Sequence, residues 1–374
     1  MDIGIHGRIA PEDHDLIREL GVTWNKVGIA VDYDISNGNE WSPGCIEVAI
    51  DERGYVERMA DLGLRVVLDV RTDYRSLSTQ AAAAFKWLAA RGMLESNENP
   101  GTHEEAIAIC KRHAKATQAV VCEDLKRRVS TVVRIHKDLV ADWEFWGEWN
   151  CPHTSRGVFD SLLSYPGLLA TFGEAVREEA PEARVWTGGN GMDIDNRWIG
   201  YILEAGHGAA FDVCNFHPYY KSDFGLADAM ADCEHRGVTF DRRTWFADAL
   251  VAQGNMMRRS FAEARAWLQA DGNDQPFACT EWGRPHYGPV PEDTRLWAES
   301  NVVPNGVPML FEDEAIAAMN QDLEVMEAAG FEVVIVHTLR DTSASHWGEH
   351  CGLIGTDGQK KATFDVVKEW AARA

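Results

Sequence analysis

The amino-acid sequence predicts an α/β protein with the (β/α)₈ architecture of a TIM barrel. Eight short apolar runs alternate with amphipathic helical segments along the 374 residues, which is the order of a parallel sheet covered by helices. The runs are almost continuously apolar, as strands are when both faces of a sheet are buried. A glycine follows several helical segments, at the position of a helix C-cap.

Helix, glycine and strand follow one another most clearly in three units. These are Asp15–Leu20, Gly21 and Val22–Val31; Val56–Leu62, Gly63 and Leu64–Val70; and Glu314–Ala329, Gly330 and Phe331–Val336. The other strands are expected near residues 3, 144, 185, 213 and 278. The other helices are expected at His103–Leu139, Tyr165–Glu179, Arg197–Ala205, Trp245–Ala270 and Phe364–Ala372.

We expect residues 1–374 to form one domain, a single barrel with long loops after strands two, three and seven. Such loops follow the carboxyl ends of strands, where a barrel carries its functional site. A doubly wound open sheet is the structural alternative. It often has a glycine-rich first turn, and the first turn here, His6-Gly7-Arg8-Ile9-Ala10, is not glycine-rich.

The composition argues against several classes of partner. A net charge of −23 disfavours nucleic acids and anionic membrane surfaces, since both require a basic surface, and it is compatible with a neutral substrate. The sequence contains no run of about 18 apolar residues, so it predicts no membrane span. The start lacks the pattern of a signal peptide, so we expect a cytoplasmic protein or a secreted one whose leader has been removed. Eight scattered cysteines without a CxxC motif predict no disulfide framework.

Two glutamates stand at the ends of apolar strands. Glu148 lies in the run Ala141–Asn150, and Glu281 lies in the run Pro276–Gly283, each beside tryptophan. A carboxylate at the exit of a core strand is costly without a function. Because a barrel brings all its strand ends to one mouth, the two carboxylates can share a cleft. Such a pair is the chemical requirement for cleaving a glycosidic bond.

Four segments carry a resemblance to a known group of enzymes. Trp143–Asn150 resembles the strand-four WEIWNEPN segment of clan A glycoside hydrolases, and Phe216–Tyr219 resembles their strand-six HPY segment. Thr280–Gly283 resembles their strand-seven TE[FW]G segment, and Gly352–Ala362 resembles their C-terminal tail. The segments occur in the right order over essentially the whole chain. The nearest families in character are those that contain β-xylosidases and cellulase-like enzymes.

The resemblance implies a retaining mechanism with double displacement. Glu148 would be the acid/base and Glu281 the nucleophile. Tyr219 would hydrogen-bond the nucleophile, and His217 would lie near the acid/base. The resemblance also implies that tryptophans offer stacking faces to the sugar, and the candidates for this are Trp282 and Trp347.

Other candidate substrate-binding residues lie at the same strand ends. They are Trp146, Asn150, His337 and Arg71. Arg71 can instead pair with Asp69, which precedes it by two residues in strand three. Glu144 lies within strand four, and we expect it to be a buried ion-pair partner inside the barrel.

The sequence departs from the clan pattern at three places. Gly147 stands where the clan usually has an asparagine that binds the 2-hydroxyl of the sugar. The strand-two arginine is absent, with Lys26 or Gly28 in its place, and the strand-eight tryptophan is replaced within Val336–Leu339. A different hydroxyl donor, such as Asn150 or Asn190, or an unusual sugar would account for Gly147. The substrate of any one family therefore cannot be assigned to this chain.

We therefore expect a retaining glycoside hydrolase that cleaves a β-linked neutral oligosaccharide or polysaccharide, with no metal and no organic cofactor. Loops that close the mouth into a pocket would favour action on chain ends. Two alternatives remain. Gly147 favours a non-catalytic carbohydrate-binding barrel, while His6, His217 and His337 are candidate ligands in a metal-dependent barrel hydrolase.

Overall fold

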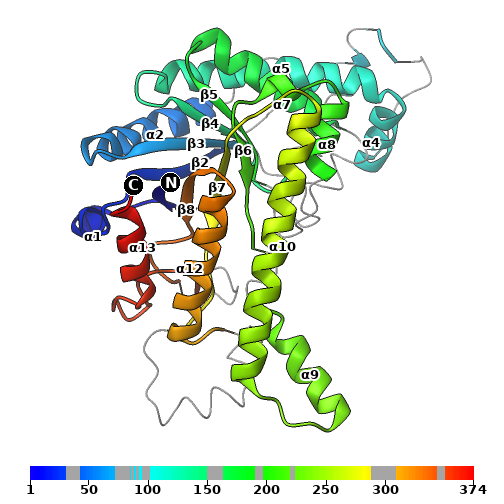
Figure 1. Cartoon of the computed structure of the whole chain (residues 1–374). Helices are drawn as coiled ribbons and strands as arrows, with labels where there is room; N and C mark the ends of the chain where they lie inside the picture. The colour runs from blue at the N-terminus through cyan, green and yellow to red at the C-terminus, as the bar shows by residue number, and fades with distance from the viewer. Residues whose placement is uncertain are drawn as a thin grey trace.

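A computed structural model shows eight parallel strands in a nearly closed barrel (Figure 1). The structure describes residues 1–30, 43–71, 85, 88–89, 92–94, 102–149, 163–189, 197–219, 224–287, 309–342 and 350–374. The strands are β1 Asp2–His6, β2 Trp24–Ala30, β3 Arg65–Arg71, β4 Asp142–Phe145, β5 Arg184–Thr187, β6 Cys214–Phe216, β7 Phe277–Trp282 and β8 Phe331–Val336. They confirm all eight predicted strand positions and the (β/α)₈ class.

The strands pair in the order β5-β4-β3-β2-β1-β8-β7-β6. The two end strands meet through one parallel bridge between Trp186 and Val213, and the amide of Thr187 donates to the carbonyl of Val213 at 3.0 Å. This contact nearly closes the sheet. The carboxyl ends of all eight strands therefore meet at one end of the barrel, which we call the mouth.

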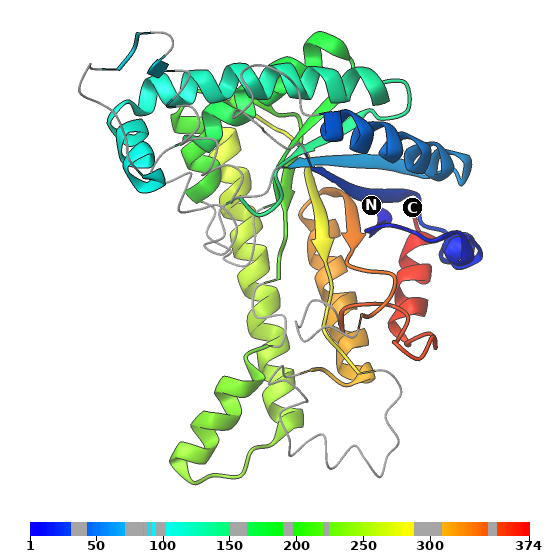
Figure 2. The same ribbon diagram turned by 180° about the vertical axis from the view of Figure 1, so that it is seen from behind.

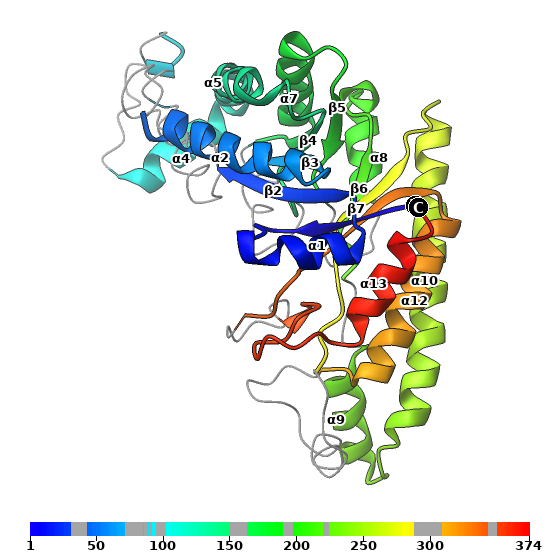
Figure 3. The ribbon, with the colours of Figure 1, turned by 90° about the vertical axis from the view of Figure 1, so that its left-hand side faces the viewer.

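Helices cover the outside of the barrel. They are α1 His14–Leu20, α2 Pro43–Asp61, α4 His103–Arg112, α5 Ala114–His136, α7 Tyr165–Glu179, α8 Arg197–Glu204, α9 Leu226–Arg236, α10 Arg242–Ala270, α12 Glu312–Ala328 and α13 Thr363–Ala371. From the side, α2, α5 and α7 lie over one half of the sheet, and α1, α12 and α13 lie over the other (Figure 3). Gly21 ends α1 with φ of 70°, which confirms its predicted role as a C-cap.

Two parts of the helical layer differ from the prediction. The expected helix at residues 103–139 is two helices, because His113 leaves the helical region at φ −104° and ψ 36°. The sequence analysis also expected no helix between strand six and Trp245, yet α9 lies there, and α9 and α10 both project beyond the barrel (Figures 1 and 2). The loops predicted after strands two, three and seven lie largely outside the described residues. In the described part of the chain, no helix is both long and apolar enough to cross a membrane.

Alternate residues of each strand face the barrel interior, as the two-residue period of a strand requires. At the N-terminal end of the barrel, interior side chains form an apolar layer. Its members are Trp24, Val67, Trp186, Val213, Ala278, Val333 and Ile335. Two residues further along their strands, Lys26, Asp69 and Thr280 are fully buried. The interior is therefore apolar at one end and charged toward the mouth.

A buried ion pair holds the end of β7 against α12. Asp322 of α12 accepts hydrogen bonds from the indole of Trp282 at 3.0 Å and from Nε of Arg284 at 2.8 Å. Both charged side chains are fully buried. Burial raises the pKa of Asp322 above its ordinary value, although Arg284 opposes this shift. The pair fixes the backbone that immediately follows Glu281.

Replacing Asp322 by alanine should lower the free energy of unfolding by about 3–5 kcal/mol, because it leaves the buried Arg284 charge without its partner. Glu324→Ala, at an exposed position of the same helix, should change it by about 0.5 kcal/mol or less. Urea denaturation of both variants measures the difference. Equal stabilities would show that the pair does not anchor β7.

Candidate active site

Glu281 lies at the mouth near the end of β7 and is surrounded by cationic and imidazole groups. Its Oε1 is 3.1 Å from Nζ of Lys26 and 3.5 Å from Nε2 of His6. Its Oε2 is 3.8 Å from Nδ1 of His217. The side chain is 16% exposed, so one edge of this carboxylate remains accessible from the mouth.

Lys26 connects the charged groups inside the barrel. Its fully buried ammonium lies 3.2 Å from Glu144 and 3.6 Å from Asp69, in addition to Glu281. It also donates to the hydroxyl of Thr280 at 3.3 Å. These partners come from β3, β4 and β7. The contact with fully buried Glu144 confirms the prediction of an ion pair for that residue.

The three charged groups have different protonation preferences. Burial would raise the pKa of Glu281, but the charge of Lys26, helped by nearby histidines, holds that pKa well below its ordinary value. Burial raises the pKa of Glu144, and Lys26 opposes this only in part. Burial lowers the pKa of Lys26 while its carboxylates raise it, and the net shift is upward. Glu281 is therefore ionised and Lys26 stays charged.

Glu148 approaches Glu281 from the turn after β4. Its backbone has a positive φ of 53°, and its amide donates to the carbonyl of Gly189 at 2.9 Å. This turn directs the side chain, which is 19% exposed, toward His217, with 3.3 Å between Glu148 Oε1 and His217 Nδ1. One carboxylate oxygen of Glu148 lies within 4.8 Å of one of Glu281. The structure thus brings together the two glutamates that the sequence singled out.

His217 lies between the two glutamates, and the ring nitrogen on its other side is bonded to Thr280. Its Nε2 is hydrogen-bonded to the hydroxyl of Thr280 at 2.9 Å. The ring packs directly against Gly189, since a Cβ atom at that position would lie 2.0 Å from the imidazole Nε2. The absence of a side chain at Gly189 therefore creates the space that His217 occupies.

Several other expected contacts differ in the structure. Trp282 cannot provide a stacking face, because it is fully buried and its indole is bonded to Asp322. Trp146 is 3% exposed and packs in the main core, so its ring is not a sugar platform either. Tyr219 makes no hydrogen bond to Glu281, although burial and then Glu281 raise its pKa.

The remaining candidates are placed as follows. Arg71 is half-exposed at the end of β3, and its guanidinium lies 3.9 Å from Asp69, beyond hydrogen-bonding distance. The expected pairing of these two residues is therefore loose. The guanidinium lies over Gly28 and interacts electrostatically with Glu281 and Glu148. Asn150 and Trp347 lie outside the described residues.

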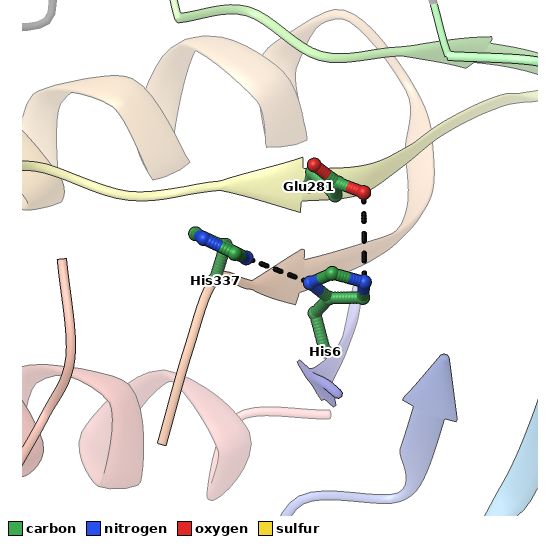
Figure 4. Close-up of side chains that lie close together, drawn as sticks. All are labelled: His6, Glu281 and His337. Carbon is green, nitrogen blue, oxygen red and sulfur yellow. Dashed lines mark hydrogen bonds and ion pairs between the residues drawn. The ribbon is translucent and has the colours of Figure 1, made fainter. Parts of the chain in front are cut away.

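The sequence did not single out the imidazole pair beside Glu281. His337, directly after β8, lies with its Nδ1 2.7 Å from Nδ1 of His6 at the end of β1 (Figure 4). The sequence also did not assign a central role to Lys26, although a lysine within the apolar strand Trp24–Ala30 was a signal for one. Neither contact could be derived from spacing, because the partners come from strands far apart in the chain.

Two sets of side chains have the chemistry of metal ligands. His6, Glu281 and His337, and likewise Glu148, His217 and Glu281, bring one ligand atom each within 4.8 Å of one another. However, the ammonium of Lys26 lies 3.1 Å from Glu281 Oε1 and would repel a divalent cation there. His6 and His337 are also bonded directly to each other. The described residues fit a hydrogen-bonded carboxylate site better than a metal centre.

Solved structures resemble this chain over nearly its full length. A family 39 glycoside hydrolase from the gut symbiont Bacteroides cellulosilyticus WH2 has a TM-score of 0.56 at 15% identity, and the match covers 99% of this chain and 63% of that one. An exo-β-1,4-mannosidase from Opitutaceae bacterium strain TAV5 has a TM-score of 0.56 at 13% identity, with 100% and 59% covered. The GH53 catalytic domain from Ignisphaera aggregans has a TM-score of 0.53 at 12% identity, with 98% and 95% covered.

The chain has the fold of the clan A glycoside hydrolases. It spans 63% and 59% of the length of the family 39 enzyme and the mannosidase. No protein-family model and no curated protein matches the sequence. At identities of 12–15% the structures establish the fold alone, so residue roles and substrate rest on the geometry of this site.

Gly189→Ala should disrupt the site, because the new Cβ would overlap the imidazole of His217. We expect a loss of about 1–3 kcal/mol in unfolding free energy and a chemical-shift change at His217. Gly54→Ala in α2 is the control, since its Cβ would meet only Nη1 of Arg58, at 3.7 Å. Thermal unfolding and imidazole NMR compare the two. An unperturbed His217 in Gly189→Ala would contradict the packing.

Proposed function

We propose that this chain is a retaining glycoside hydrolase that cleaves a β-linked neutral oligosaccharide or polysaccharide by double displacement. In this proposal Glu281 is the nucleophile and Glu148 is the acid/base. The observation that carries the proposal is the close approach of the two carboxylates, with oxygens within 4.8 Å of each other. Retaining enzymes have carboxyl groups about 5–5.5 Å apart, whereas inverting enzymes need about 6.5–9.5 Å to admit a water.

The charge distribution supports the assignment of roles. A nucleophile must be ionised, and the pKa of Glu281 is held well below its usual range by Lys26 against the effect of burial. Glu281 Oε1 is the oxygen nearest Lys26 and His6. The other oxygen, Oε2, faces His217 and the Glu148 side, so Oε2 is the atom that attacks.

The first displacement follows from this arrangement. Oε2 of Glu281 bonds to the anomeric carbon while the bond from that carbon to the leaving-group oxygen breaks. Glu148 gives its proton to that oxygen, and a glycosyl ester with Glu281 results. His217, hydrogen-bonded to Thr280, holds Glu148 on the leaving-group side of the sugar, opposite the face that Glu281 attacks.

The second displacement reverses the role of Glu148. Its carboxylate takes a proton from water, the water oxygen bonds to the anomeric carbon, and the ester bond to Glu281 breaks. Two inversions give net retention.

At the rim, the half-exposed guanidinium of Arg71 is suited to donate hydrogen bonds to sugar hydroxyls.

Glu281→Gly should lower hydrolysis of aryl β-glycosides by about 10⁴-fold or more, because the nucleophile is gone. Azide should restore part of the turnover and give a glycosyl azide of inverted configuration, since one displacement replaces two. Glu148→Gly should instead give an azide of retained configuration with an activated leaving group. NMR of the azides distinguishes the two products, and a reversed pattern would exchange the proposed roles.

A matched glutamate variant and two further outcomes complete this test. Glu332 is half-exposed in β8, at the end away from the mouth, and Glu332→Gln should keep wild-type activity. Sugar binding without turnover in the wild type would instead favour the carbohydrate-binding barrel. Loss of activity on chelation, restored by a divalent metal, would favour the metal-dependent hydrolase.

The pH profile of kcat/KM should fall on its acidic side with an apparent pKa below the ordinary pKa of glutamate, which is about 4.3. We call this side of the profile the acid limb. This limb reports ionisation of the nucleophile in the free enzyme. Because the pKa of Glu281 is lowered, the carboxylate remains charged as the pH falls past that value. A pH series of initial rates on an aryl glycoside measures the limb. A limb at or above the ordinary value would contradict the assignment of Glu281.

A further inference from the structure

The imidazole pair formed by His6 and His337 is not used by the mechanism above. The two Nδ1 atoms are 2.7 Å apart, and the ring centroids are 4.9 Å apart with an interplanar angle of 32°. The second nitrogen of His6, Nε2, lies 3.5 Å from Oε1 of Glu281. Figure 4 shows His6 at the centre of the group, with one dashed line to His337 and another to Glu281.

The contacts determine which nitrogens carry protons. A ring nitrogen that faces an ionised carboxylate must present a proton, because two lone pairs would repel each other. His6 Nε2 is therefore protonated. In a neutral ring Nδ1 of His6 then carries only a lone pair, so it accepts a hydrogen bond from Nδ1–H of His337. These protonation states allow hydrogen-bond donation in one direction only, from His337 to His6 and from His6 toward Glu281.

The surroundings keep His6 neutral. Burial lowers the pKa of His6 well below its usual value; Glu281 opposes this shift, while Lys26, His337 and Arg71 reinforce it. These are the charged or titratable groups that face the ring from β7, β2, the end of β8 and β3. A neutral ring can only donate from one nitrogen and accept at the other, which is the pattern that the two contacts require.

We propose that His6 is a positioning residue, which donates from Nε2 to Oε1 of Glu281 and is itself oriented by His337. The proposal deepens the proposed function and rests on Glu281 as nucleophile. With Oε1 held by Lys26 and His6, Oε2 is presented to the sugar. Catalytic hydrogen bonds are often long without substrate and tighten in its complex, which accommodates the 3.5 Å contact.

The hydrogen bond matters most in the second displacement. In the glycosyl ester Oε1 is a carbonyl oxygen, and it regains negative charge as the ester bond to Oε2 breaks. A donor at Oε1 stabilises that charge in the transition state. Loss of the donor should therefore slow deglycosylation more than glycosylation. For a substrate with an activated aryl leaving group, kcat reports deglycosylation and kcat/KM reports glycosylation.

Two amide substitutions separate a positioning role from a structural one. The amide nitrogen of glutamine reaches about as far as imidazole Nε2, so His6→Gln retains a donor to Glu281. The amide of asparagine reaches about as far as Nδ1, so His6→Asn retains a partner for His337 but no donor to Glu281. The two variants remove the same ring and leave different hydrogen bonds.

We expect His6→Asn to lower kcat about 30-fold on a dinitrophenyl β-glycoside, with a smaller fall in kcat/KM. Its acid limb should move up by about one pH unit, because Glu281 loses a hydrogen bond to its charged form. His6→Gln should retain most of the activity and the wild-type limb. His207→Asn, at a partly exposed position before the 3₁₀ turn Gly208–Ala210, should match the wild type.

Equal losses in both His6 variants, with unchanged acid limbs, would overturn the proposal while leaving the proposed function intact. Absence of glycoside hydrolysis by the wild type would instead refute the proposed function. The tautomers can be read without turnover, by ¹⁵N NMR of the imidazoles in the wild-type chain. The expected result is Nε2–H for His6 and Nδ1–H for His337, and the opposite tautomer of His6 would also overturn the proposal.

Discussion

The buried ammonium of Lys26 is the interaction on which the candidate site depends. It lies within 3.6 Å of carboxylates from β3, β4 and β7. Without a cation at this point, three buried acidic groups would face one another in a medium of low polarity, which is strongly unfavourable. Arg71, 3.9 Å from Asp69, is a second and more distant cation. The raised pKa of Glu144 favours its protonated form, which reduces the repulsion among the carboxylates.

The same interaction explains why Glu281 differs from an ordinary buried glutamate. Burial alone would favour its protonated form, whereas Lys26 favours the charged form and prevails. The site thus obtains an ionised carboxylate in a partly dry environment, where its charge is more effective than in water. The barrel separates this charged layer from the apolar layer of Trp24 and Trp186, so the apolar core and the charged mouth occupy different depths of one interior.

Compared with the clan pattern that the sequence resembles, this site keeps the paired glutamates and the histidine between them while its surroundings differ. Lys26 interacts with Glu281 from strand two, where the clan has arginine. Next to strand eight, an imidazole pair occupies the region beside Glu281. Gly147 adds no polar group near Glu148, and a side chain there would meet atoms at ordinary contact distance. The polar environment of the two glutamates is therefore particular to this chain.

The sequence by itself determined the eight strands, most of the helices and the two glutamates that lie together at the mouth. These features are local: strand and helix periodicities, glycine caps and short motifs are each contained in a few neighbouring residues. It did not reveal α9, the burial of Trp282, or the contacts of Lys26 and His6. Those depend on which side chains meet when strands more than 100 residues apart close into a barrel, as for Lys26 with Glu144 and His6 with His337. Distances, protonation and hydrogen-bond direction arise only from that closure, so the tertiary structure alone decided them.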